Sequence, residues 1–398
     1  MWNPLTSFRP SAHDDEEFRR RRSELLAAAP IPFIWLLGKT GSGKTSVIRL
    51  LTGADKAVIG QGYRPQTQEA ALFSFPDDDA PLVRFLDTRG IGEANYDPAG
   101  QVAEFHEQAH LVIVSVRATD QATEEIVRPL KQIRKANPGR PVLLAITCLH
   151  DAYPGSQHPD PDPYDSTPRP LPNSLPADSL PSDLRRALEA HYERFDGLFD
   201  RAVPIDLTPV DEGYAVPDFG GPRLKQAILE LLPGAYRQTL LQMDQLAHAL
   251  GELHHRRILP VIFAHSLLAA TAAAVPFPWV DIPFVLAIQS HLTYRLARMN
   301  EQPLDAATLA RVGSAIGGRV AVQMGIREGL KFIPWLGSAV NAAAAFAFTY
   351  ASGWVWNWYF LEVRKGHVPK PDDLRQMYRQ ELQKAAQVWR VQQTGSPP

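Results

Sequence analysis

Cysteine is almost absent from this chain of 398 residues, since Cys148 is the only one. A single cysteine excludes an intramolecular disulfide framework and is typical of proteins in a reducing compartment. The first 30 residues contain the charged run 14–22, so they lack the apolar core of about 7–15 residues that a signal peptide needs. The formal net charge is only −2, so no overall basic field favours a nucleic-acid partner. We therefore expect a cytoplasmic protein that does not bind nucleic acid.

The first apolar run of the chain occupies residues 31–37, and a glycine-rich motif follows it. The sequence from Gly38 to Thr45 is GKTGSGKT, which matches the phosphate-binding loop G-x-x-x-x-G-K-[ST]. Glycines let backbone N–H groups converge on phosphate oxygens, and the helix N-terminus that follows adds a partial positive charge. Lys44 is expected to reach the β- and γ-phosphates, and the Thr45 hydroxyl to ligate Mg²⁺. The residues expected to surround the phosphates are Gly38, Lys39, Thr40, Gly41, Ser42, Gly43, Lys44, Thr45 and Ser46.

A second motif, D-x-x-G, ends the apolar run 83–86 with Asp87 and Gly90. Burial of the strand would hold the Asp87 carboxylate in place to bind Mg²⁺ through water. The Gly90 N–H can approach a γ-phosphate because no side chain projects from its Cα. In the loop between the motifs, Thr67 is a candidate for placing its hydroxyl on Mg²⁺ and its N–H on the γ-phosphate; alternatively, it merely begins the next strand. Lys44, Thr67 and Gly90 are thus the predicted catalytic residues, and Thr45, Asp87 and Thr67 the predicted metal site.

Short apolar runs alternate with polar helical stretches after a charged N-terminal helix predicted within 1–30. This alternation predicts a mainly parallel sheet covered by helices, and so an α/β domain over 31–233. The expected strands are 32–37, 69–75, 82–87, 110–117, 141–147 and 202–207, and the expected helices are 44–52, 100–108, 122–136, 182–199 and 222–232.

Residues 151–181 interrupt this pattern with nine prolines and few large aliphatic residues. Such a segment cannot bury enough apolar surface to fold alone. We expect an insert that forms an irregular surface loop beside the nucleotide site, although its Pro-Leu-Pro motif could instead bind a partner domain.

The two motifs together resemble those of the Era/septin-like branch of the P-loop GTPases, over residues 31–233. The loop sequence GKTGSGKT is similar to that of septins, chloroplast-import GTPases and immunity-associated GTPases. The resemblance implies a three-layer α/β sandwich that binds GTP or GDP with Mg²⁺ and hydrolyses GTP.

The guanine-reading motif N-K-x-D of such GTPases is missing, because the strand at 142–146 leads into the sequence TCLHD at 147–151. In the import GTPases a histidine helps to hold the base, so the resemblance gives His150 this role with Thr147 beside it. The alternative is an ordinary loop histidine, and an ATPase of similar architecture stays open. Leu207 and Thr208 are expected to complete the base pocket through backbone groups.

Catalytic groups of Ras-like enzymes are also missing. Ile91 stands where a glutamine would orient the attacking water, and Gly41 stands where potassium-activated relatives have asparagine. Hydrolysis by the isolated chain is therefore expected to be slow. Relatives with this gap supply groups across a nucleotide-face homodimer, for which the candidate donors here are Arg64, Arg89 and His150.

The composition changes in the C-terminal part, 234–398, which is predicted to be all-helical. Residues 258–288 hold one charge and residues 332–361 hold none. Their proline-containing motifs resemble the YcjF-type domain of unknown function, which follows an Era-like GTPase in many bacterial proteins and is often membrane-associated. Three hypotheses stay open: a hairpin inserted in the inner membrane, a bundle in which both segments form the core, and a form that inserts when nucleotide triggers it.

These features predict a switch that couples GTP hydrolysis to a membrane-associating helical domain. The alternative is a nucleotide-binding scaffold with little hydrolysis that recruits a protein partner.

Overall fold

The computed structural model describes residues 31–53, 63–65, 70–88, 108–152, 158–160, 162–164, 180–208, 217–234, 236–237, 239–241, 253–274, 281–304, 308–316 and 336–394. The chain divides into two compact units, one of residues Ile31–Gln245 and one that includes Leu246–Pro398. The predicted boundary at 233 falls within the first unit. The predicted helices at 1–30 and 100–108 lie outside the described residues.

The first unit is built on a seven-stranded sheet in the order β2-β3-β4-β1-β5-β6-β7. The five strands from β4 to β7 in this order run parallel, and β2 and β3 form an antiparallel edge. The central strands are almost wholly buried and apolar, as expected when helices cover both faces of a parallel sheet. The strands are β1 (Phe33–Leu37), β2 (Tyr63–Pro65), β3 (Ala70–Phe75), β4 (Val83–Thr88), β5 (Leu111–Arg117), β6 (Val142–Thr147) and β7 (Arg201–Pro204).

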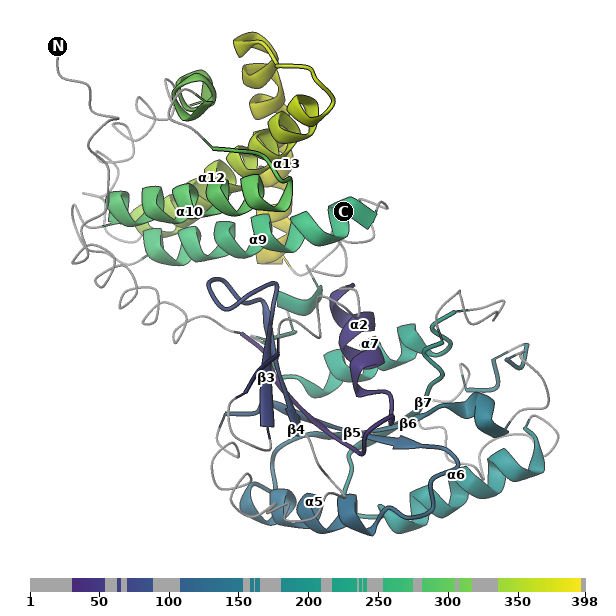
Figure 1. The fold of residues 1–398 in the computed structure, drawn as a ribbon. Helices are drawn as coiled ribbons and strands as arrows, with labels where there is room; N and C mark the ends of the chain where they lie inside the picture. The colour runs from purple at the N-terminus through teal and green to yellow at the C-terminus, as the bar shows by residue number, and fades with distance from the viewer. Residues whose placement is uncertain are drawn as a thin grey trace. The chain divides into compact units, whose positions relative to one another are not determined.

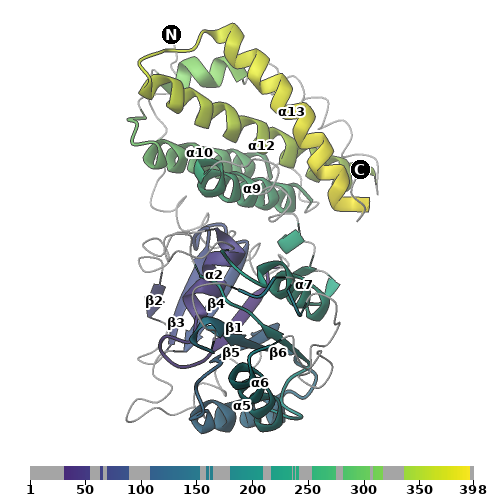
Figure 2. The ribbon, with the colours of Figure 1, turned by 90° about the vertical axis from the view of Figure 1, so that its right-hand side faces the viewer.

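Helices cover the sheet on both sides. Figures 1 and 2 show α2 (Lys44–Thr52) and α7 (Gly221–Leu231) on one face, with α5 (Glu124–Ala136) and α6 (Ser182–Arg194) on the other. One buried cluster joins α5 and α6 to alternate residues of the strands, among them Trp35, Val112 and Leu144. This arrangement confirms the predicted α/β three-layer sandwich.

Parts of the proline-rich insert are packed into the first unit, which corrects the expectation of a surface loop for these residues. The Tyr164 side chain is fully buried, with the Arg223 guanidinium 5.1 Å from its ring centroid. Arg223 Nη1 also donates to Asp162 at 2.8 Å. The segment cannot fold alone, but a few side chains suffice to dock it on a domain that is already folded.

The second unit is helical in its described part and comprises α9 (Leu253–Ala274), α10 (Asp281–Met299), a helical stretch at 308–316, α12 (Leu336–Arg364) and α13 (Pro371–Thr394). The apolar helices pack against one another: α12 contacts α9, α10 and α13, and the rings of Phe263 and Phe346 meet edge to face at 5.6 Å. Across the described residues, none of the helices combines the length and the apolar content that crossing a bilayer requires.

A buried amide pair joins the residue that follows α10 to α12, and it yields a stability prediction. Asn300 Nδ2 donates to Asn357 Oδ1 at 3.1 Å, and both residues are fully buried. Asn357→Leu removes the acceptor while leaving the Asn300 amide in the core, so it should lower the free energy of unfolding by about 1–3 kcal/mol. Replacing both asparagines by leucine should cost less than the single change, because no polar group is then left unpaired. Urea unfolding of the two variants checks this order; a double variant less stable than the single one would contradict it.

Candidate functional site

The phosphate-loop motif occupies the turn from β1 to α2, as predicted. β1 ends at Leu37 and α2 begins at Lys44. Gly43 adopts φ +84°, a left-handed conformation that side chains rarely take, and its carbonyl accepts the Val47 N–H at 3.0 Å. The loop therefore leads directly into a helix N-terminus, where backbone N–H groups favour an anion.

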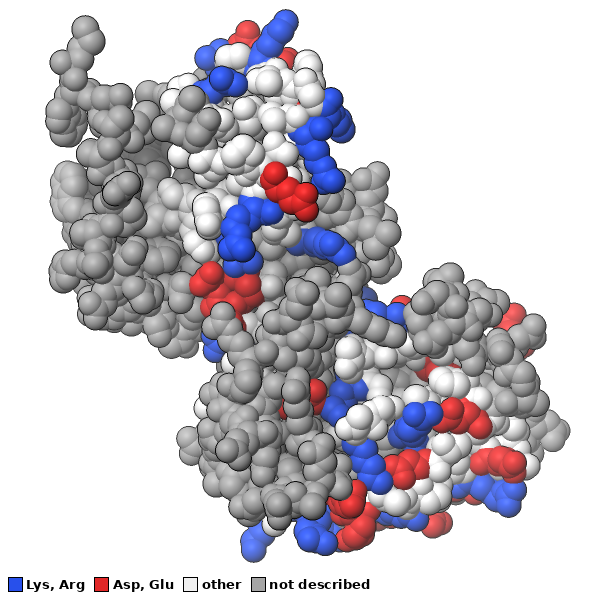
Figure 3. All heavy atoms as spheres, viewed as in Figure 1, with Lys and Arg blue, Asp and Glu red and all other residues white. Residues whose placement is uncertain are grey.

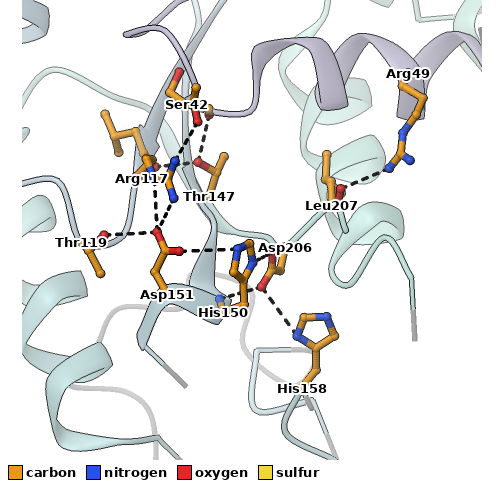
Figure 4. Close-up of polar contacts among 12 residues, drawn as sticks. Ser42, Arg49, Arg117, Thr119, Thr147, His150, Asp151, His158, Asp206 and Leu207 are labelled. Carbon is orange, nitrogen blue, oxygen red and sulfur yellow. Dashed lines mark hydrogen bonds and ion pairs between the residues drawn. The ribbon is translucent and has the colours of Figure 1, made fainter. Parts of the chain in front are cut away.

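Two side-chain hydroxyl groups hold the middle of the loop by hydrogen bonds. The Ser42 carbonyl oxygen accepts hydrogen bonds from Ser115 Oγ at 2.6 Å and from Thr147 Oγ1 at 2.9 Å (Figure 4). Ser115 lies in β5 and Thr147 ends β6, so the next two strands on one side of β1 hold the loop. The structure thus gives the Thr147 hydroxyl a contact with the loop, where the sequence suggested a neighbour of the base.

Gly38 begins the loop where no side chain fits. A Cβ at this position would lie 2.4 Å from the Ser115 carbonyl oxygen and 2.6 Å from Ser42 Oγ. The carbonyl belongs to the backbone of β5, so the loop or the strand must shift. We expect Gly38→Ala to lower the free energy of unfolding by about 1–3 kcal/mol and to weaken GDP binding, measured by denaturant unfolding and by titration.

The matched control for this change is Gly139→Ala in the turn before β6. A Cβ there would meet only Asn137 Oδ1, at 3.7 Å, which is an ordinary contact. Its effect on stability should stay within about 0.5 kcal/mol. Equal stability of the Gly38→Ala and Gly139→Ala proteins would show that the loop tolerates a Cβ at Gly38.

The Lys44 ammonium lies over the loop. Its Nζ donates to the carbonyl oxygens of Gly38 and Lys39 at 2.7 and 2.9 Å, and lies 3.8 Å from Asp87 Oδ1. Burial lowers the pKa of Lys44, and the Asp87 carboxylate opposes that shift. The two sequence motifs therefore bring a cation and a carboxylate to the same point at the carboxyl edge of the sheet.

The predicted metal residues are only partly described. Thr45, in the first turn of α2, and Asp87, in β4, supply one hydroxyl and one carboxylate; Thr67 and Gly90 lie outside the described residues. In the part of the chain that the structure describes, no three His, Cys, Asp or Glu side chains come together as a metal cage. One carboxylate and one hydroxyl fit Mg²⁺, which in nucleotide sites takes its other ligands from phosphates and water.

The second lysine of the loop points away from this centre. Lys39 Nζ lies 3.1 Å from Asp120 Oδ2 and also donates to the Ala122 carbonyl. Burial of Asp120 acts to raise its pKa, but the hydrogen bonds from Lys39 and the Ala122 N–H outweigh this and leave the pKa lowered. Lys39 thus fastens the outer side of the loop to the segment after β5.

His150 lies in a short 3-10 turn after β6, and a carboxylate from the segment after β7 holds it. His150 Nδ1 lies 2.7 Å from Asp206 Oδ1, and the His150 backbone N–H donates to Asp206 Oδ2 at 2.7 Å (Figure 4). Burial raises the pKa of Asp206, while the hydrogen bonds from His150 act in the opposite direction. His158, from the insert, lies 3.8 Å from Asp206 Oδ2 and stacks on Phe219.

An arginine links the segment around His150 to the phosphate loop. Arg117 Nη2 donates to Asp151 Oδ2 at 2.7 Å, and Arg117 Nη1 lies 3.5 Å from the Gly41 carbonyl oxygen. The hydrogen bond with Asp151 raises the pKa of Arg117. Arg117 and Asp206 were missed by the sequence analysis. Their positions in the sequence could have indicated them. Arg117 ends a parallel strand and Asp206 follows one, at the edge of the sheet where ligands bind.

Leu207 and Thr208 follow β7, as expected, but their carbonyl oxygens have partners within the domain. Arg49 Nη2 donates to the Leu207 carbonyl at 3.2 Å, and the Asp218 N–H donates to the Thr208 carbonyl at 3.1 Å. The prediction that these residues complete a base pocket through backbone groups therefore depends on their N–H groups.

Comparison with known proteins gives one family match. Residues 33–148 match the family described as 50S ribosome-binding GTPase. No curated protein matches the chain.

The solved structures similar to this chain include three that match over half of its length. The bacterial selenocysteine-specific elongation factor EF-Sec has 16% identity over 50% of this chain and 28% of its own, with a TM-score of 0.31. Elongation factor SelB from Methanococcus maripaludis has 16% identity over 50% and 33%, with a TM-score of 0.30. The G domain of the T. maritima FeoB iron transporter has 18% identity over 50% and 98%, with a TM-score of 0.29. The chain thus spans a third or less of the length of the two elongation factors.

The phosphate-loop geometry and the carboxylate at the end of β4 agree with the family match. Together they identify residues 33–148 as part of a P-loop GTPase domain.

Proposed function

We propose that this protein is a Mg²⁺-dependent GTP-hydrolysing switch. The observation that carries the proposal is that Lys44 Nζ lies 3.8 Å from Asp87 Oδ1. Both groups lie beside a loop that the Ser115 and Thr147 hydroxyls hold in place by hydrogen bonds. A fixed cation and a fixed anion, one for the phosphates and one for the metal, are what phosphoryl transfer requires of a protein.

Each group has a defined part in this proposal. Lys44 leaves the Gly38 and Lys39 carbonyls to bind the β- and γ-phosphates, where it stabilises charge that develops on the transferred group. Thr45 and Asp87 hold Mg²⁺, which when bound neutralises charge on the phosphate oxygens. Thr67 and Gly90 are proposed to contact the γ-phosphate, so that their loops order with GTP and relax after hydrolysis.

Slow turnover and activation by dimerisation are further parts of the proposal. They are supported by the sequence, because Ile91 cannot orient water. Arg64, Arg89 and His150 are the proposed donors across a nucleotide-face homodimer. Hydrolysis per mole of protein should therefore rise with protein concentration. No turnover at any concentration would favour the alternative, a nucleotide-binding scaffold that recruits a partner.

The helical unit is proposed to transmit the nucleotide state to a membrane surface, with the protein cytoplasmic or associated with the inner membrane. Support comes from the apolar composition of 258–288 and 332–361, from the YcjF-type resemblance, and from large apolar side chains exposed on α10, Leu286 and Tyr294. On the face drawn in Figure 3, basic and acidic side chains lie on the described parts of both units.

One titration tests base choice and membrane coupling together. Purified protein is titrated with GTP, GDP and ATP, with and without vesicles of anionic phospholipid. The proposal expects guanine nucleotides to bind more tightly than ATP, and expects vesicle flotation to differ between the GTP and GDP states. Preferential binding of ATP would contradict the assignment as a GTPase, and equal flotation in both states would contradict membrane coupling.

A further inference from the structure

A buried arginine stands at the amino edge of the sheet without a partner for its charge. Arg140 lies two residues before β6, directly after an exposed turn at 135–139, and is only 4% exposed. Neither Nε nor Nη1 of its guanidinium has a hydrogen-bond partner. Among the described residues, no carboxylate forms an ion pair with it. Since an arginine stays charged in proteins, this arrangement is strongly unfavourable unless a ligand completes it.

The charged groups at the start of the next strand, β7, are paired instead. Asp200 Oδ2 accepts the Val142 N–H at 2.7 Å and Arg134 Nη2 at 2.6 Å. Arg201 Nη2 lies 3.0 Å from Glu230 Oε2. The Asp200 carboxylate therefore serves the β6 backbone and another arginine, and the charge of Arg140 remains uncompensated.

The strand on the other side places a histidine beside this charge. The Val112 N–H donates to the Pro141 carbonyl at 3.1 Å, so His110 and Arg140 precede neighbouring strands at the same edge. The Phe33 N–H donates to His110 Nδ1 at 3.0 Å, which leaves the proton of the neutral ring on Nε2. Burial lowers the pKa of His110, and the Arg140 charge lowers it further. His110 is therefore neutral at pH 7, and the positive charge beside it belongs to Arg140 alone.

These two residues lie far from the phosphate loop. β5 has seven residues and ends at Arg117, whose Nη1 lies 3.5 Å from the Gly41 carbonyl oxygen. A strand rises about 3.3 Å per residue, so about 20 Å separates the two ends of β5. A ligand at Arg140 would therefore occupy the edge of the sheet opposite to the nucleotide, and the inference does not depend on the function proposed above.

We propose that the amino edge of the sheet at Arg140, beside β5 and β6, is a second ligand site that binds a carboxylate. The planar guanidinium presents N–H donors in the geometry that carboxylate oxygens accept. Its single permanent charge matches a carboxylate, which carries one negative charge at pH 7. A phosphate group carries about 1.5–2 charges at that pH, and the neutral His110 ring adds no second positive charge to balance them.

Thermal unfolding of the full chain in sodium acetate, compared with sodium chloride at equal ionic strength and pH 7, tests the site. Acetate at ten times its dissociation constant should raise the melting temperature by about 3 °C or more. Arg140→Met keeps an apolar stem and removes the charge. It should melt in chloride at least as high as the wild type, because an unpaired buried charge is gone, and acetate should not stabilise it further.

Two control variants separate this site from other cations. Arg201→Met removes an arginine at the same edge that has its own carboxylate partner, and Lys44→Ala removes the ammonium of the phosphate loop. Both should keep the acetate-induced rise in melting temperature. Loss of the rise in Lys44→Ala would show that acetate binds at the phosphate loop and would overturn the inference.

The titration of His110 gives a local measurement of the same event. An anion that neutralises Arg140 removes a charge that disfavours the protonated ring, so acetate should raise the pKa of His110. In Arg140→Met that pKa should already be higher than in the wild type, and acetate should leave it unchanged. NMR titration of the histidine signals measures both values, with His110→Gln to assign the signal. An Arg140 with a merely structural role would leave the pKa of His110 the same with and without acetate.

Two further probes distinguish the kind of anion and its source. Inorganic phosphate should stabilise the protein through Arg140 less than acetate does, and the reverse order would overturn the assignment to a carboxylate. The peptide acetyl-Gly-Glu-Gly-amide presents one carboxylate on a chain. Binding of the peptide more tightly than acetate would support an acidic protein segment as the source, and weaker binding would support a small free carboxylate. Failure of acetate to change either the melting temperature or the His110 titration would overturn the site.

Discussion

Replacing Lys44 with alanine is expected to lower GTP turnover by about 10²–10³-fold and GTP affinity by about 10- to 150-fold. Lys44 is the cation that the loop holds at its mouth, on two carbonyl oxygens and 3.8 Å from Asp87. Phosphate oxygens offer that ammonium stronger, charged acceptors than the carbonyls do. Single-turnover hydrolysis and titration with a fluorescent GTP analogue measure the two losses separately.

This loss should occur without loss of the fold. Burial lowers the pKa of Lys44, so the charged side chain is less favourable in the folded protein than in the unfolded chain. Without nucleotide, the free energy of unfolding of Lys44→Ala should therefore lie within about 1 kcal/mol of the wild type. Thermal unfolding without and with GDP separates the effects, since GDP should raise the melting temperature of the wild type more than that of the variant.

Lys39→Ala is the matched control, with the same residue type in the same loop. Its ammonium pairs with Asp120, outside the phosphate centre, and a partly exposed pair of this kind is worth about 0–1 kcal/mol. GTP affinity should change by less than about fivefold. If Lys44→Ala bound GTP as tightly as Lys39→Ala does, the loop would not be the phosphate site.

The sheet could be predicted from sequence where burial is complete on both faces. β1, β5 and β6 are apolar runs of five to seven residues, and runs of this kind between turn signals are strong strand signals. β2 has three residues and pairs only at the edge, so it leaves no periodic pattern. The predicted strand 202–207 ends at Pro204, because proline cannot donate to a ladder and Asp206 instead forms an isolated bridge with Phe219.

The site could be predicted where function requires a local motif. The loop and Asp87 lie where the motifs indicated, because the loop follows β1, Asp87 lies near the end of β4, and these two strands are neighbours in the sheet. Asp206 escaped prediction because its partner His150 is 56 residues away in sequence, and only the order of β6 and β7 in the sheet joins them. The burial of the Tyr164 side chain was not predicted, for a similar reason. A high proline content indicates local stiffness, but it does not indicate which distant residues a segment contacts.

Asp87→Asn should weaken magnesium binding without removing nucleotide binding. The amide keeps the size of the side chain but loses the charge that attracts a cation. Loss of a group that orients the ligands of a metal typically costs about 10–100-fold in metal affinity or activity. Hydrolysis measured against Mg²⁺ concentration should therefore be half-maximal at a concentration at least tenfold higher than in the wild type, and EDTA should weaken GTP binding by the wild type more than by the variant.

Metal-free binding distinguishes this effect from misfolding. In EDTA the Asp87 carboxylate, 3.8 Å from Lys44 Nζ, repels the phosphates that Lys44 attracts, so Asp87→Asn should bind GDP in EDTA at least as tightly as the wild type. A variant damaged in its fold would bind GDP more weakly under both conditions. Asp120→Asn is the control, because its carboxylate also follows a strand at the same edge of the sheet but pairs with Lys39; its magnesium dependence should match that of the wild type. An unchanged magnesium requirement in Asp87→Asn would exclude Asp87 from the metal site.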